Sequence, residues 1–189
     1  MKFISPMQVF MFKQMFSIPD SMNILCDFLG SCIDFKDGEL KSVKLIDKEI
    51  KTTEHEKDSI LDLRVEVGNS ITGISEVDIE VQLKKYPFLN NRIAYYLSKM
   101  FANQLCEGDN YDKLHKCVSL WVLDFPLFND EEFFHSMVMQ DRNGNVLTDK
   151  MEFDCLEISK IRKTELTSNM DKNCNGQNYL RRQVRRSWI

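Results

Sequence analysis

Two segments near the middle of the chain alternate apolar and polar residues. From position 61 of Ile60–Val67, odd positions hold Leu or Val and even positions hold Asp, Arg or Glu. In Glu76–Gln82 the odd positions are again apolar, and the even positions hold Glu, Asp, Glu and Gln. A period of two is typical of strands with one buried face. Because Gly68-Asn69 follows the first segment as a turn signal, the pattern predicts an antiparallel hairpin.

Three other segments repeat apolar residues at intervals of three and four, which predicts helices. They are Met7–Phe16, then Met22–Leu29 ending at Gly30, and a segment that starts at Asn90 or Asn91 and runs to about Glu107.

Further strands complete one sheet. They are expected at Leu40–Lys48, Lys116–Phe125, Phe134–Gln140 and Phe153–Ile158. The order of elements predicts an α/β (α+β) domain with a mixed sheet over residues 1–160. From Thr164 onward the chain loses periodicity, and residues 161–189 are expected to form a basic C-terminal tail that is poorly ordered or truncated.

Composition narrows the class of protein. Of 189 residues 43% are hydrophobic, which suffices for one packed domain. The longest mainly apolar run, Val118–Leu123, is far short of the roughly 20 residues that span a membrane. No signal peptide is recognisable and the six Cys form no CxxC pair, so we expect a cytoplasmic protein with free thiols, no zinc site and no membrane partner.

The net charge of −4 is unevenly distributed. Residues 161–189 contain seven basic and two acidic residues, so the rest of the chain is acidic. This excludes a general basic nucleic-acid binder. An acidic body can still act on nucleic acid if a metal ion screens its carboxylates.

The candidate chemistry lies on the polar side of the predicted hairpin. If the two strands pair, the carboxylates of Asp62 and Glu80 project to the same side, and Gln82 points the same way. Oxygen ligands of this kind suit Mg²⁺, with Mn²⁺ as the alternative, and the amide of Gln82 could hold an attacking water. The competing interpretation is that these polar residues form the solvated face of an antiparallel sheet.

One face of the third predicted helix is also polar. Arg92, Tyr96 and Lys99 follow each other at helical spacing and are expected to face DNA phosphates, together with Arg64 beside the acidic pair. In the competing interpretation Tyr96 is a core residue and Lys99 is a solvated charge.

A family resemblance rests on motifs in a fixed order. They are Asp62-Leu63-Arg64, then Val77–Gln82 (VDIEVQ), then Arg92 with Tyr95-Tyr96, and outside these Phe12-Lys13 and Leu156-Glu157-Ile158 with Lys160. Over roughly residues 7 to 160, this series resembles the PD-(D/E)XK nuclease family transposases, also called recombination-promoting nucleases.

The resemblance implies a restriction-endonuclease-like fold and a metal-dependent DNA endonuclease linked to transposition or recombination. It implies that Asp62 and Glu80 bind the metal, that Gln82 stands in place of the family's Lys, and that Arg92 and Tyr96 are the residues of the following helix. A homodimer is possible, and the resemblance does not decide whether one forms.

The sequence departs from the family pattern at Val9, where an acidic residue is usual. The alternative prediction is therefore a catalytically inactive remnant or a DNA-binding module with the same fold. A third alternative is an interaction domain whose acidic face binds a basic partner.

Overall fold

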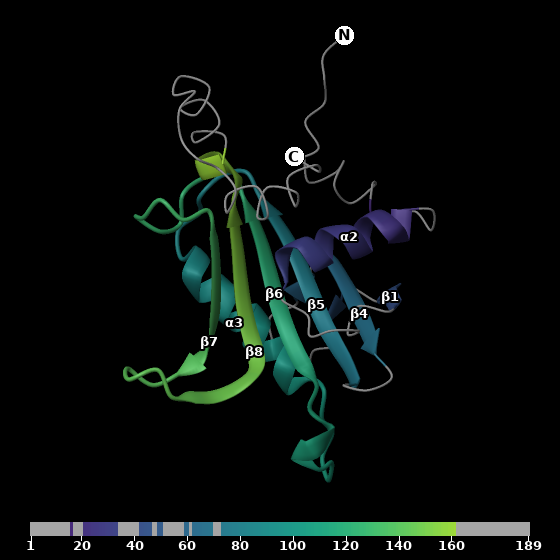
Figure 1. Ribbon diagram of the computed structural model, residues 1–189. Coiled ribbons are helices and arrows are strands. Elements are labelled where there is room, and N and C mark those ends of the chain that lie inside the picture. Colours follow the sequence, from purple (N-terminus) through teal and green to yellow (C-terminus); the bar gives the residue numbers. More distant parts are fainter. Residues whose placement is uncertain are drawn as a thin grey trace, which may run out of the picture.

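The computed structural model describes residues 16, 21–33, 42–46, 49–50, 59–60, 62–69 and 73–161 (Figure 1). The predicted first helix, apart from Phe16, lies outside the described residues. So do Val9 and the basic tail beyond residue 161.

A six-stranded mixed sheet forms the centre of the molecule, as the sequence predicts. Its order is β1-β4-β5-β6-β8-β7. The strands are β1 (Ser42–Leu45), β4 (Leu63–Asn69), β5 (Gly73–Gln82), β6 (Lys116–Leu123), β7 (Phe134–Gln140) and β8 (Val146–Glu157), and a separate two-stranded sheet pairs β2 (Glu49–Ile50) with β3 (Ser59–Ile60). The predicted antiparallel hairpin is confirmed as β4–β5. Strands β5, β6 and β8 run parallel, so their carboxyl ends meet at one edge of the sheet.

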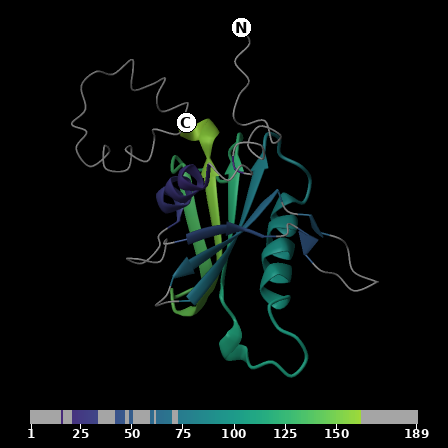
Figure 2. The same cartoon turned by 90° about the vertical axis from the view of Figure 1, so that its right-hand side faces the viewer.

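Helices cover both faces of this sheet. Figures 1 and 2 show α2 (Met22–Cys32) on one face and α3 (Leu89–Ala102) on the other. The α2 side holds the apolar residues of the β4–β5 hairpin, including Val65 and Ile79. The α3 side holds Trp121 and Leu123 of β6. A short 3₁₀ helix, η2 (Tyr111–Lys113), precedes β6. Within the described part of the chain, no helix combines the length and apolar character of a membrane span.

The predicted end of α2 at Gly30 is wrong, because the helix continues to Cys32. Leu25, Leu29 and Cys32 form one buried stripe along it. Burying the last member of that stripe requires another turn, and a single Gly inside a helix costs only about 1 kcal/mol. The backbone N–H of Ile33 then donates to the carbonyl of Leu29 and closes the helix.

The predicted bounds of α3 also need correction. The helix begins at Leu89 and ends at Ala102 rather than near Glu107. The reason for the early end is Gln104, whose side chain accepts from the backbone N–H of His115 and donates to its carbonyl. This pairing draws the chain away from the helix axis towards the start of β6.

Several predicted strands differ in extent. The hairpin strands are Leu63–Asn69 and Gly73–Gln82 rather than Ile60–Val67 and Glu76–Gln82. The predicted turn at Gly68-Asn69 is wrong, because the pairing of the two strands continues to Asn69 and Gly73.

The first strand spans Ser42–Leu45 in the described part of Leu40–Lys48, and Ile46 lies outside it, while the apolar central strand ends at Leu123 rather than Phe125. Strand β8 starts at Val146 rather than Phe153, and it ends at Glu157 rather than Ile158. Its first half pairs with β7 around a turn at Gly144, whose φ of +88° suits glycine, and it is polar and exposed enough to resemble a loop in sequence.

Asp154 of β8 is a fully buried carboxylate. Burial, and next the charge of Glu152, raise its pKa to about 7. At pH values between the ordinary pKa of an Asp, near 4, and this raised pKa, the native state binds more protons than the unfolded state. The free energy of unfolding therefore falls as the pH rises through this range.

Asp154→Asn should remove this dependence, because the amide does not titrate. The stability of the variant relative to wild type should rise by about 2–4 kcal/mol between pH 4 and pH 8. Urea denaturation at the two pH values measures it. Asp149→Asn, an exposed change on the same strand, is the matched control. If the free energy of unfolding depended on pH equally in both variants, Asp154 would not be the source of the pH dependence.

Candidate active site

The β4–β5 pairing brings Asp62 and Glu80 together. Leu63 pairs with Ile79, so Asp62, the residue just before β4, lies opposite Glu80 on the α3 side of the sheet. The backbone N–H of Asp62 donates to Oε1 of Glu80 at 3.0 Å. The backbone N–H of Val81 donates to Oδ2 of Asp62 at 3.3 Å. Each carboxylate is thus fixed by the neighbouring strand, and the predicted adjacency of the two residues is confirmed.

Gln82 joins the same group at the carboxyl end of β5. Its Nε2 donates to Oε2 of Glu80 at 3.5 Å, a long hydrogen bond. Two residues apart on one strand, the two side chains share a face, as the alternation predicts.

The expectation of a solvated sheet face is wrong at this position. Glu80 is completely buried and Asp78 is 1% exposed. The cause is α3, which packs over this side of the sheet. The alternating pattern identifies a polar face correctly, but it does not reveal that a helix covers that face.

Burial of several carboxylates changes their protonation. The pKa of Glu80 is raised to about 7, first by burial and then by the charge of Asp62, while Arg92 opposes the shift. The pKa of Asp78 is raised well above its usual range by burial and by Glu80. Trp121 Nε1 donates to Ser119 Oγ at 2.9 Å, and that hydroxyl donates to Oδ2 of Asp78 at 3.2 Å. Among the described residues, Oδ1 of Asp78 has no hydrogen-bond partner.

Arg92 of α3 is the cation that faces Glu80. Its guanidinium lies 3.1 Å from Oε2 of Glu80. The Cζ atom lies 4.9 Å from the ring centre of Tyr96 and 5.5 Å from that of Trp121. These contacts hold the guanidinium over two aromatic faces. The side chain is still 37% exposed, so Arg92 lies between the buried carboxylate and solvent.

The other predicted DNA-contacting residues differ from Arg92 in exposure. Tyr96 is 9% exposed, as its core interpretation expects, and it supports Arg92. Lys99 is only 8% exposed, so the interpretation as a solvated charge is wrong, and its Nζ lies 5.6 Å from the ring of Tyr95. Arg64 donates to Oε1 of Glu76 at 2.5 Å. Contact of all three with DNA stays a prediction.

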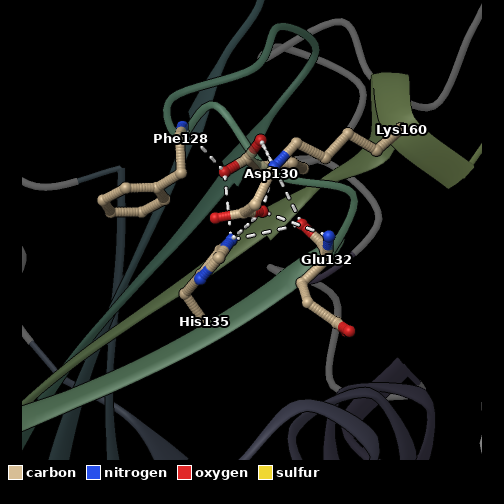
Figure 3. Close-up of polar contacts among 6 residues, drawn as sticks. Phe128, Asp130, Glu132, His135 and Lys160 are labelled. Atoms are coloured by element: carbon tan, nitrogen blue, oxygen red, sulfur yellow. Dashed lines mark hydrogen bonds and ion pairs between the residues drawn. The ribbon is translucent and has the colours of Figure 1, made fainter.

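A second polar cluster lies at the same sheet edge and was missed by the sequence reasoning as a site (Figure 3). It surrounds Glu157, which is fully buried at the end of β8, two strands away from Gln82. Lys160 Nζ lies 2.8 Å from Oε2 of Glu157 and 2.9 Å from Oδ1 of Asp130. His135 Nε2 lies 3.2 Å from Oδ1 of Asp130, and its ring packs on Phe128 at 4.4 Å between centres.

The cluster ties three segments to one another. The backbone N–H of Phe128 donates to Oε1 of Glu157, and Lys160 donates to the carbonyl of Glu132. The loop after β6 is thereby attached to β8 and to the residues that follow it. Since the cation of Lys160 sits at the centre, the cluster works as a structural clamp. The signal in the sequence that pointed to this cluster was the family pattern Leu156-Glu157-Ile158 with Lys160.

The family profile of the PD-(D/E)XK nuclease family transposases matches residues 6–183. The chain belongs to this family. The match covers the whole sheet, the site at Asp62 and Glu80, and most of the basic segment after residue 161. A search of curated proteins finds no match, and neither does a search of solved structures. The mixed sheet with helices on both faces is consistent with the fold of this nuclease family.

The chemistry of the donor set fits a hard divalent cation. Asp62 and Glu80 supply carboxylate oxygens from adjacent strands, and their mutual repulsion favours a bound positive charge. In the described residues no three His, Cys, Asp or Glu side chains converge as a complete ligand set. The fit rests on the pair itself, because Mg²⁺ takes one or two carboxylates and fills its other positions with water and phosphate oxygens.

Lys160→Met should destabilise the protein by about 3–5 kcal/mol, because Glu157 would stay buried without its cation. Urea denaturation measures the loss. The double variant Lys160→Met/Glu157→Leu should recover much of it, since it replaces the pair by apolar residues.

The matched control for this clamp is Lys113→Met. It removes an ion pair with Asp109 in which Lys113 is 61% exposed, and solvent screens that pair. It should leave stability unchanged within error. If Lys160→Met also left stability unchanged, the cluster would not be a clamp.

Proposed function

We propose that this protein is a metal-dependent DNA endonuclease associated with transposition or recombination. The observation that carries the proposal is the reciprocal anchoring of Asp62 and Glu80, each held by a backbone N–H of the opposite strand. Membership of a nuclease family supplies the reaction class, and the paired carboxylates supply the chemistry that phosphodiester hydrolysis needs.

Asp62 and Glu80 would hold Mg²⁺ or Mn²⁺. A bound cation of this kind polarises a phosphate oxygen and lowers the pKa of a bound water. The 37% exposure of Arg92 gives solvent, and hence a phosphate, access to the guanidinium from the outer side of Glu80.

The protein's own side chains position the reactants. The amide of Gln82, beside Glu80, orients the attacking water by accepting or donating a hydrogen bond. Arg92 partly offsets the charge of Glu80 while no cation is bound, and its planar guanidinium is suited to bind the phosphate next to the cleaved bond. Tyr96 and Trp121 keep Arg92 in that place by stacking.

Asp62→Asn and Glu80→Gln should each reduce cleavage by about 10³-fold or more, because each removes a metal ligand while preserving shape. Nicking of supercoiled plasmid is the measurement, with Mg²⁺ or Mn²⁺ titrated against EDTA. Circular dichroism checks that the variants fold.

Glu66→Gln is the control for this pair of variants. Glu66 lies on the same face of the hairpin, four residues along from Asp62, or about 13 Å at strand spacing. Its cleavage should stay within about twofold of wild type. Cleavage retained in both site variants would place the active site elsewhere. A wild type that binds DNA but does not cleave with either metal would favour the DNA-binding module over the nuclease.

A further inference from the structure

The segment Leu83–Phe88, here called the aromatic loop, joins the candidate active site to α3. It begins directly after Gln82, the last residue of β5, and ends where α3 begins. All six residues are exposed. They include Tyr86, which is 55% exposed, and Phe88, which is 80% exposed. A loop beside a polar site thus presents two large aromatic rings to solvent.

The backbone holds Phe88 outward at a conformational cost. Phe88 has φ 61° and ψ 24°, and it is the single non-glycine residue with positive φ in the described part of the chain. Such an outlier in a bulky residue often marks a functional position. The carbonyl of Phe88 accepts from the backbone N–H of Arg92 at 3.1 Å, so the backbone of Phe88 is joined to the first turn of α3.

The loop also carries positive charge. Lys84 and Lys85 are exposed, and neither forms an ion pair with a described residue. In an otherwise acidic body, they stand two and three residues from Gln82. A shallow hollow of about 550 Å³ runs along Lys85–Asn91 and is lined by Tyr86 and Phe88.

Exposed cations next to exposed aromatic rings are the combination that binds single-stranded nucleic acid. Lysines bind the backbone phosphates, and the rings stack on bases. Stacking requires a base whose face is free, which a fully paired duplex does not offer. Phe88 and Arg92 are one helical turn apart, or about 5.4 Å along the helix axis. Two nucleotide steps of about 3.4 Å exceed this distance, so neighbouring nucleotides of one strand could contact both residues.

We propose that the aromatic loop is a subsite for an unpaired stretch of DNA next to the cleaved bond. Lys84 and Lys85 bind its phosphates, and Phe88, with Tyr86, stacks on an unpaired base. This inference rests on the proposed function and specifies its substrate as DNA with a single-stranded or frayed segment.

Binding without cleavage tests the inference. The full-length protein is titrated in EDTA with a labelled 20-nucleotide single strand and with the matching 20-base-pair duplex, and fluorescence anisotropy is recorded. Phe88→Gly removes the ring while suiting the positive φ. It should weaken single-strand binding roughly 5- to 100-fold and duplex binding less than twofold. Phe88→Trp should restore single-strand binding.

Two further variants separate stacking from charge. Tyr111→Ala removes an aromatic residue that is 82% exposed before β6, at the opposite sheet edge, and should change neither affinity. The double variant Lys84→Gln/Lys85→Gln should weaken both complexes and lower the salt slope of single-strand binding by about 1.4. A 2-aminopurine base in the single strand should be quenched by wild type and not by Phe88→Gly.

The outcomes distinguish failure of the loop proposal from failure of the proposed function. A wild type that neither binds nor nicks DNA overturns both. A wild type that nicks plasmid, with Phe88→Gly binding both DNA forms normally, overturns the loop subsite alone. Loss of binding to phosphatidylserine vesicles in Phe88→Gly, with DNA binding unchanged, would also overturn it by assigning the loop to a lipid surface.

Discussion

The burial of Glu80 beneath α3 is the constraint on which the rest of the site depends. A carboxylate removed from water must be neutralised, protonated or surrounded by hydrogen-bond donors. Here Glu80 accepts hydrogen bonds from the backbone of Asp62, the amide of Gln82 and the guanidinium of Arg92. Even so its pKa rises to about 7, first because the group is buried and then because Asp62 lies beside it. Arg92 therefore offsets only part of the cost of burying this carboxylate beside Asp62.

Sheet topology places this charge at the carboxyl ends of the parallel strands. Because β5, β6 and β8 are parallel, Gln82, Leu123 and Glu157 line up at one edge. The antiparallel β4 adds Asp62 at the same level. The clamp around Glu157 fixes the loop after β6 at that edge. A loop held by a buried ion pair therefore lies beside the site.

Much of this could be predicted from the sequence, and the omissions have physical causes. Alternation is a local property, so it gave the β4–β5 hairpin and the shared face of Asp62, Glu80 and Gln82. Whether a polar face meets water or a helix depends on distant residues, and so the burial of Glu80 was missed. The end of α3 depends on Gln104 pairing with His115, a contact that periodicity within the helix does not encode. The polar first half of β8 is ordered by pairing with β7 rather than by its own apolar residues.

Helix α3 links the two halves of the proposed substrate site. Its first turn carries Arg92 against Glu80, and its N-terminal boundary is Phe88. The positive φ of Phe88 turns the chain sharply out of the loop, and the backbone bond to Arg92 makes that turn part of the helix. Packing of Ile93, Leu97 and Met100 against the sheet then fixes the helix. The backbones of Phe88 and Arg92 are therefore held by one element. A nucleotide stacked on the ring and a phosphate bound by the guanidinium would be positioned together, through the same packing that buries Glu80.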